Sequence, residues 1–166
     1  MFILSPDATG ITQRIQLKSS PVFLAVTGVL DGEHRIAVAC RNRTIYLLKN
    51  GQLSGGPIEL EVQPVALCIV NKHIFVGCMN STVQAYQLRG RKSYTLYMPS
   101  PVIAMEQLFH PLTGSKALLV SLANGEVRLY NEANKFLISV VRQGSMPTIS
   151  PQTGGDSPTP AGAAPP

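Results

Sequence analysis

The chain has 166 residues, of which 45% are hydrophobic and 14% charged, and its formal net charge is +5. This apolar content excludes a disordered polyelectrolyte, and the apolar runs are far shorter than the roughly 18 residues that a membrane span needs. Three cysteines cannot form a paired disulfide framework, which favours a reducing, cytoplasmic location. We expect one domain, or part of one.

The first predicted element is a β-hairpin within residues 2–18. Phe2-Ile3-Leu4 is a short apolar run, Pro6-Asp7 is typical of a turn, and a second run extends from Ile11 to Leu17. Because no signal-peptide pattern precedes it, this segment is expected to be structural. We interpret it as the last two strands of a repeat unit that is only partly present.

Three complete repeat units follow when the chain is aligned on an asparagine. Asn42, Asn80 and Asn124 are roughly 40 residues apart, and a Pro-Val pair opens each unit. Each unit offers four short apolar runs, which predict four strands. We place the units at residues 21–60, 64–98 and 101–141.

The second run of each unit is small and apolar on both faces, as expected of an inner strand covered on both sides. Each asparagine then predicts a turn, since Asn and Gly tolerate a positive φ, and Asn124-Gly125 is the strongest hairpin signal. Residues 104–109 have good helical propensities on their own. The repeat register nevertheless predicts a strand there.

Four strands in about 40 residues are typical of a β-propeller blade. The predicted fold is therefore all-β: three four-stranded blades plus part of a preceding one, within a partial propeller at residues 1–142. Propellers close with four to eight blades. We expect the exposed end faces of this arc to be apolar and the isolated chain to be poorly soluble.

Residues 143–166 differ in composition, being rich in Pro, Gly, Ala and Ser with Asp156 as the single formal charge. Such a segment cannot bury enough apolar surface to offset its chain entropy, so we predict disorder. A linker or loop insertion is favoured over a Pro-rich ligand for an SH3-type domain.

Several residue patterns have a simpler explanation than a chemical site. Cys68, His73 and Cys78 could suggest a metal, but Cys40 and Cys78 share one repeat position with Leu122, which indicates core packing. Asn42 and Asn80 lie in glycosylation sequons, yet turn formation explains both. We predict no metal, no cofactor and no glycan.

Two basic clusters are the candidate partner-contact surface: Arg41 with Arg43, and Arg89 and Arg91 with Lys92. Both lie at predicted turns, so a solvated surface is favoured, and binding to an acidic protein face or to acidic lipid headgroups is the alternative. Nucleic acid is disfavoured because no exposed aromatic residues alternate with these charges. No catalytic constellation or phosphate-binding glycine loop is recognisable, so we predict no enzymatic activity.

Parts of the sequence resemble the Bardet–Biedl syndrome protein family, in the member that is the first-numbered subunit of the BBSome. The likeness extends, with gaps, over residues 2–141. Its segments are Pro21-Val22-Phe23-Leu24, Ala39-Cys40-Arg41-Asn42 with Ile45-Tyr46, Gln63-Pro64-Val65, and Leu122-Ala123-Asn124-Gly125-Glu126-Val127-Arg128. The sequence departs from the family pattern at Arg43, where a hairpin glycine is more usual, and throughout the tail.

The resemblance implies an N-terminal seven-bladed propeller, of which this chain looks like the middle-to-late blades. It also implies a subunit of a membrane coat that acts in ciliary membrane-protein trafficking and cilium assembly. Its partners would be a GTP-bound Arf-like small GTPase, other BBSome subunits and ciliary cargo, at the ciliary base and membrane. The alternative is a propeller scaffold of another cytosolic complex.

Overall fold

The computed structural model describes residues 1–5, 7–29, 32–109, 114–131 and 136–142, with the backbone alone for residues 136–140 and 142. All regular structure in these residues is β-strand. An N-terminal hairpin pairs β1 (Phe2–Leu4) with β2 (Ile11–Arg14). Three larger antiparallel sheets follow in chain order. The tail at 143–166, predicted to be disordered, lies outside the described residues.

The three sheets are consecutive along the chain, and we number them as blades. Blade 1 has the order β3-β4-β5-β6 with β7 also paired to β5, blade 2 the order β11-β10-β9-β8, and blade 3 the order β12-β13-β14-β15. The strand bounds in blade 1 are β3 (Pro21–Gly28), β4 (His34–Cys40), β5 (Thr44–Lys49), β6 (Gln52–Leu53) and β7 (Ile58–Glu59). Those of blade 2 are β8 (Pro64–Val70), β9 (His73–Cys78), β10 (Thr82–Gln87) and β11 (Lys92–Tyr97). Those of blade 3 are β12 (Val102–Phe109), β13 (Lys116–Leu122), β14 (Glu126–Asn131) and β15 (Phe136–Arg142).

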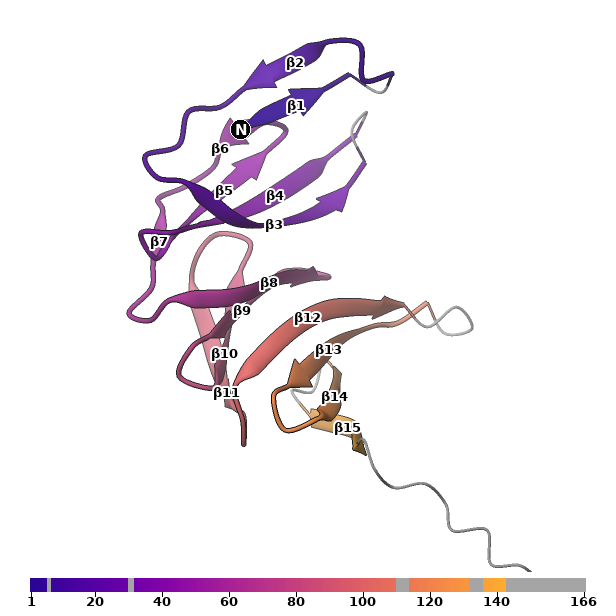
Figure 1. The fold of residues 1–166 in the computed structure, drawn as a ribbon. Coiled ribbons are helices and arrows are strands. Elements are labelled where there is room, and N and C mark those ends of the chain that lie inside the picture. The colour runs from indigo at the N-terminus through magenta and orange to yellow at the C-terminus, as the bar shows by residue number, and fades with distance from the viewer. Residues whose placement is uncertain (6, 30–31, 110–113, 132–135, 143–166) are drawn as a thin grey trace, which may run out of the picture.

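The sheets stack face to face, each on the one before it, as the sequence of colours in Figure 1 shows. One apolar cluster fills each interface. Ile15 packs with Val38 and Leu48 between the hairpin and blade 1, Ile45 lies in the cluster between blades 1 and 2, and Phe75 in the cluster between blades 2 and 3. Antiparallel sheets stacked in this way form part of a β-propeller. The predicted all-β propeller fold is confirmed.

Burial along the second strand of each blade depends on whether one face or both are covered. Residues 36–40 of β4 and 74–78 of β9 are all buried, because each strand has apolar neighbours on both faces. In β13 buried and half-buried residues alternate, since blade 2 covers one face alone. The alternation of burial in β13 therefore shows that one face of blade 3 is not covered by another described sheet.

Two segments show how the strands predicted from the repeat compare with the strands of the structure. Residues 104–109 lie in β12, which pairs along β13 from Val102↔Leu122 to Phe109↔Lys116. The strand prediction for this segment is confirmed, because pairing and burial of Met105 outweigh its helical propensity. The outer edge of blade 1 differs from the expected single strand: β6 and β7 each pair with part of β5.

The turn after the second strand of each blade places a positive φ on the residue after the asparagine. These residues are Arg43 (φ 62°), Ser81 (φ 59°) and Gly125 (φ 80°). Asn42, Asn80 and Asn124 lie in these turns, as predicted, and the positive φ falls on the residue that follows each of them. The asparagines act through their side chains instead: Asn124 Oδ1 accepts a hydrogen bond from the Glu126 N–H at 3.1 Å.

Exchanging the residue types at two equivalent turn positions should move stability in opposite directions. Ser81→Gly is expected to raise the free energy of unfolding by about 0.5–1 kcal/mol, because glycine relieves the left-handed strain. Gly125→Ser should lower it by about 1 kcal/mol for the same reason. Urea denaturation of both variants measures the two shifts, and a loss of stability in Ser81→Gly would contradict the turn geometry.

Both ends of the stack expose apolar side chains. On β3, Leu24 and Val26 are 56% and 64% exposed, and on blade 3, Leu108 and Val141 are 45% and 64% exposed. On β3, the alternating residues Phe23 and Ala25 pack on the opposite face, against the cluster between blades 1 and 2. Low solubility of the isolated chain remains a prediction that these faces support.

Candidate functional site

A groove between blades 1 and 2 brings charged side chains of both blades together. It encloses a cavity of about 460 Å³. Its lining residues are Glu33, Arg35, Lys72, His73, Gln87, Leu88 and Arg89. Three of these seven side chains, Arg35, Lys72 and Arg89, are cationic, so the groove is a candidate anion-binding surface.

Strand ends and turns position the basic residues. Arg35 is the second residue of β4 and His73 the first of β9, two places that are equivalent in the repeat. Lys72 lies in the β8–β9 turn and Arg89 in the β10–β11 turn. Both turns reverse the chain through a positive φ, at Asn71 (50°) and Gly90 (90°). Blade 2 therefore brings two separate turns to the same end of the groove.

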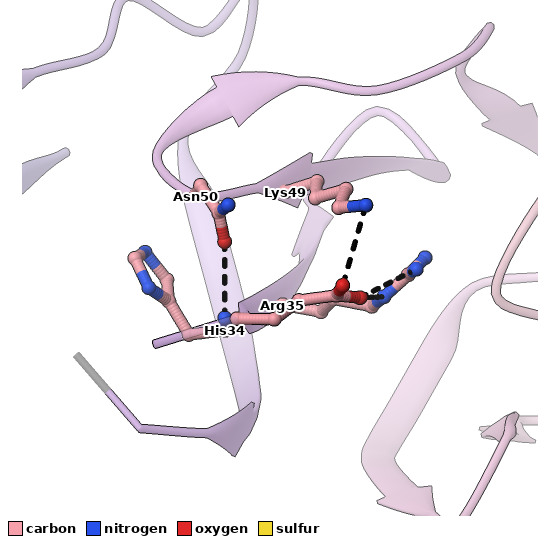
Figure 2. A network of polar contacts seen from close by, with 5 residues as sticks. His34, Arg35, Lys49 and Asn50 are labelled. Atoms are coloured by element: carbon pink, nitrogen blue, oxygen red, sulfur yellow. Dashed lines mark hydrogen bonds and ion pairs between the residues drawn. The ribbon is translucent and has the colours of Figure 1, made fainter. Parts of the chain in front are cut away.

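Glu33 links the two strands that form the blade 1 wall of the groove (Figure 2). Its Oε1 accepts hydrogen bonds from Arg35 Nε and Nη2 at 3.0 and 2.8 Å, and its Oε2 lies 3.4 Å from Lys49 Nζ. Arg35, and after it Lys49, lowers the pKa of the Glu33 carboxyl. Glu33 is therefore ionised at neutral pH and neutralises part of the positive charge.

Two hydrogen bonds between His34 and Asn50 hold β4 against the end of β5. The His34 N–H donates to Asn50 Oδ1 at 3.1 Å, and the Asn50 N–H donates to the His34 carbonyl oxygen at 3.0 Å. Figure 2 shows the His34 ring on the side away from Arg35. The pairing fixes the direction in which Glu33 and Arg35 project.

The remaining two cations of the groove have no such neutralising contact. Among the residues that the structure describes, neither Lys72 nor Arg89 has an ion-pair partner, and both are exposed. The groove therefore has two unpaired cations beside the partly neutralised network around Glu33. This arrangement can hold an anion, and its lining offers no nucleophile paired with a base.

The five basic residues that were predicted as a partner-contact surface lie at different places in the structure. Arg89 lines the groove, and Arg91 is exposed in the same turn. Arg41 and Arg43 lie in the β4–β5 turn of blade 1, where Arg43 Nη1 donates to the Glu61 carbonyl oxygen at 2.9 Å. The sequence reasoning missed Arg35 and Lys72. The signal was present, since Arg35 and His73 coincide in the repeat alignment.

Lys92 lies at a second cavity, of about 350 Å³, near the outer edge of blades 1 and 2. Glu59 and Glu61 are among its lining residues. Lys92 thus shares its cavity with two acidic residues, and Arg43 is held by a backbone carbonyl. The five basic residues thus do not form one continuous surface around a single cavity.

The three cysteines are buried and lie in different apolar clusters. Cys40 packs between the hairpin and blade 1, Cys78 between blades 1 and 2, and Cys68 between blades 2 and 3. Cys68 and Cys78 therefore lie on opposite faces of one sheet and cannot share a metal ion with His73. Among the described residues, no group of three His, Cys, Asp or Glu side chains has a geometry suited to a metal.

Burial should make these thiols unreactive in the folded chain. Desolvation, with a smaller contribution from Glu106, raises the pKa of Cys68 from 9.0 to about 12. Desolvation also raises the pKa values of Cys40 and Cys78. At pH 8 we expect negligible labelling by a maleimide in buffer and labelling of all three thiols in denaturant.

The same shifts predict a loss of stability in alkali. A raised thiol pKa stabilises the fold at pH values below the unfolded pKa, near 9, and this stabilisation is lost as the pH rises toward the folded value. The urea midpoint should therefore fall between pH 9 and 12, and fall less when Cys68 is replaced by alanine. Rapid labelling at pH 8 in native buffer would contradict the buried placement.

Known proteins resemble this chain in sequence. A family model described as ciliary BBSome complex subunit 1 matches residues 1–49. The human and mouse BBSome complex members BBS1 are 39% and 38% identical to the chain over 144 residues, which is 85% of this chain. The chain is similar to these BBS1 proteins over most of its own length. The resemblance noted from its sequence motifs is confirmed.

A solved structure extends the BBS1 similarity to the fold. A crystal structure of BBS1N in complex with ARL6DN matches with a TM-score of 0.79 and 44% sequence identity, over 85% of this chain and 43% of that chain. The chain spans 24% of the length of the human and mouse BBS1 proteins. The similarity therefore concerns a part of the BBS1 propeller.

No helix in the described residues is long and apolar enough to cross a bilayer. This finding concerns the segments between residues 1 and 142 that the structure describes.

Proposed function

We propose that the chain is a protein-interaction module, part of the propeller of a BBSome coat subunit, and that this propeller binds a GTP-loaded Arf-like small GTPase. The proposed role is ciliary membrane-protein trafficking and cilium assembly, from the cytoplasm and the ciliary base to the peripheral face of the ciliary membrane. The remaining partners are other BBSome subunits and ciliary cargo.

The observation that supports this proposal most directly is the match to BBS1N in complex with ARL6DN. At 44% identity and a TM-score of 0.79, the chain shares the fold of the part of BBS1N that it matches. The structure of the chain itself supports a binding role, because its polar features lie in turns and at blade junctions. Propellers commonly bind partners with such surfaces.

We propose a scaffold role without catalysis. In the groove and in the cavity at Lys92, the charged groups are paired with oppositely charged neighbours or face solvent, and general acid–base catalysis needs convergent groups beside a substrate pocket. Arg41, Arg43, Arg89, Arg91 and Lys92 are proposed as partner contacts at two separate places rather than as one footprint.

A nucleotide-dependent retention assay tests the proposed GTPase binding. An intact propeller that includes these residues should be retained on an immobilised Arf-like GTPase loaded with a GTP analogue and lost when the GTPase carries GDP. The matched control is the same propeller with Gly77→Leu, because a side chain there meets Val102 Cγ1 at 3.0 Å and disrupts the blade 2–blade 3 contact.

The two nucleotide states distinguish the proposed role from its alternative. Retention on the GTP form alone supports a coat subunit recruited by the GTPase. Equal retention on both forms, or retention on neither by a folded propeller, would contradict the proposal and favour a propeller scaffold of another cytosolic complex.

A further inference from the structure

We propose that the groove between blades 1 and 2 binds an extended acidic peptide segment of a partner protein. This inference goes beyond the proposed function and does not depend on it. It rests on the shape of the groove, on the placement of its charges and on its apolar floor, all within the described residues.

The shape is that of a trough. The cavity of about 460 Å³ shares Glu33, Arg35 and Leu88 with a neighbouring cavity of about 210 Å³, which continues to Thr27 and Gly28 at the end of β3. The two cavities thus form one concave path from blade 1 to the turns of blade 2. An extended chain fits such a path better than a compact ion does.

The charges are arranged in two zones along this path. At the blade 1 end, Glu33 contacts both Arg35 and Lys49, at 2.8 and 3.4 Å, and neutralises part of their positive charge. At the blade 2 end, Lys72 and Arg89 lack ion-pair partners among the described residues. Carboxylates of a bound segment would therefore be attracted to the blade 2 end, where they complete the charge pairing.

The floor of the groove is apolar and anchored. Leu88 is half-buried and packs against the cluster between blades 1 and 2. It lines both cavities, together with Glu33 and Arg35. The groove thus offers one apolar contact with cations on its rim, which suits a peptide with carboxylates around an apolar side chain.

The concave placement argues for a protein segment over a membrane. A bilayer surface is flat on this scale and needs cations that project together from a convex or planar face, whereas Arg35 is half-buried in the wall and paired with Glu33. The lining also lacks Phe, Tyr and Trp, on which the bases of single-stranded nucleic acid would stack.

Fluorescence polarisation with a synthetic peptide tests the proposal. The probe is a short fluorescent peptide of glutamates around a central leucine, and its control has glutamines in place of the glutamates. The protein is the whole chain on a soluble fusion partner. We expect the glutamate peptide to bind, the glutamine peptide to bind at least about tenfold more weakly, and the affinity to fall as salt is raised.

Charge reversal locates the binding on the protein. Lys72→Glu and Arg89→Glu should each weaken glutamate-peptide binding by about tenfold, because each replaces an attraction by a repulsion. Lys18→Glu is the matched control, since Lys18 is exposed outside the groove and the change in net charge is the same. This control should stay within about twofold of the parent. Circular dichroism of each variant verifies that it is folded.

Each other outcome overturns the proposal. Absence of glutamate-peptide binding, or an equal loss in Lys18→Glu, would exclude the groove as an acidic-peptide site. If the protein bound phosphatidylserine vesicles but not the peptide, and Lys72→Glu weakened that vesicle binding, the groove would be assigned to a membrane surface. A propeller carrying Lys72→Glu should keep its GTP-dependent GTPase retention, so failure of one proposal is distinguishable from failure of the other.

Discussion

Replacing Phe75 by alanine is expected to lower the free energy of unfolding by about 3–5 kcal/mol. Phe75 is 1% exposed and lies in the cluster between blades 2 and 3. Its ring meets that of Tyr94 edge to face, with the ring centroids 6.3 Å apart. The substitution leaves a cavity at an interface between two blades, where collapse is opposed by hydrogen-bonded strands on both sides.

The measurement is urea denaturation followed by circular dichroism, with Tyr97→Ala as the control. Tyr97 is on the same blade but 81% exposed, so its truncation should change stability by less than about 0.5 kcal/mol. A Phe75→Leu variant keeps part of the volume and should lie between the two. Similar losses in Phe75→Ala and Tyr97→Ala would show that blades 2 and 3 do not pack through this cluster.

The second large effect concerns an ion pair at the same interface. Arg128 Nε and Nη2 donate to Glu126 Oε2 at 2.9 and 2.8 Å, and the two side chains are 17% and 8% exposed. A hydrogen bond with Tyr130, and the contact with Glu126, raise the pKa of Arg128, so the guanidinium stays charged. Glu126→Leu should therefore lower the free energy of unfolding by about 2–3 kcal/mol, because it leaves this charge without its counter-ion.

A second substitution distinguishes the cost of leaving Arg128 without a counter-ion from the cost of losing the other contacts of Glu126. Glu126→Leu combined with Arg128→Met removes both charges and keeps similar volumes, and we expect it to lie within about 1 kcal/mol of the parent. Urea denaturation of the single and double variants measures the difference. A double variant as unstable as Glu126→Leu alone would mean that Glu126 acts through contacts other than Arg128.

The blade architecture was predictable from the sequence because its determinants recur. A small apolar strand, an asparagine turn and a β-branched strand return roughly every 40 residues, and this period identifies four-stranded units without any single strong motif. The same register correctly predicted a strand at residues 104–109 against local propensity. Pairing with β13 decides that segment, and pairing is visible in a sequence through the repeat.

The details that the sequence reasoning missed depend on backbone geometry and on contacts between blades. A turn motif does not specify which of its residues takes a positive φ, so the strain at Arg43 and Ser81 needed coordinates. The blade 1 edge is divided because residues 54–57 interrupt the pairing with β5, so that β6 pairs with one end of β5 and β7 with the other. The groove joins Arg35 with Lys72 and Arg89 across two blades, which periodicity within one blade cannot reveal.

The stacking of the sheets in Figure 1 also has a consequence for how the chain opens. Each apolar cluster joins one sheet to the next, so cooperativity should pass along the chain as nearest-neighbour coupling, as in a linear array. Blade 2 has a neighbour on both faces, while blade 3 has one. Amide hydrogen exchange should therefore be slowest in β8 and β9 and progressively faster toward both ends, a gradient of protection along a one-dimensional structure.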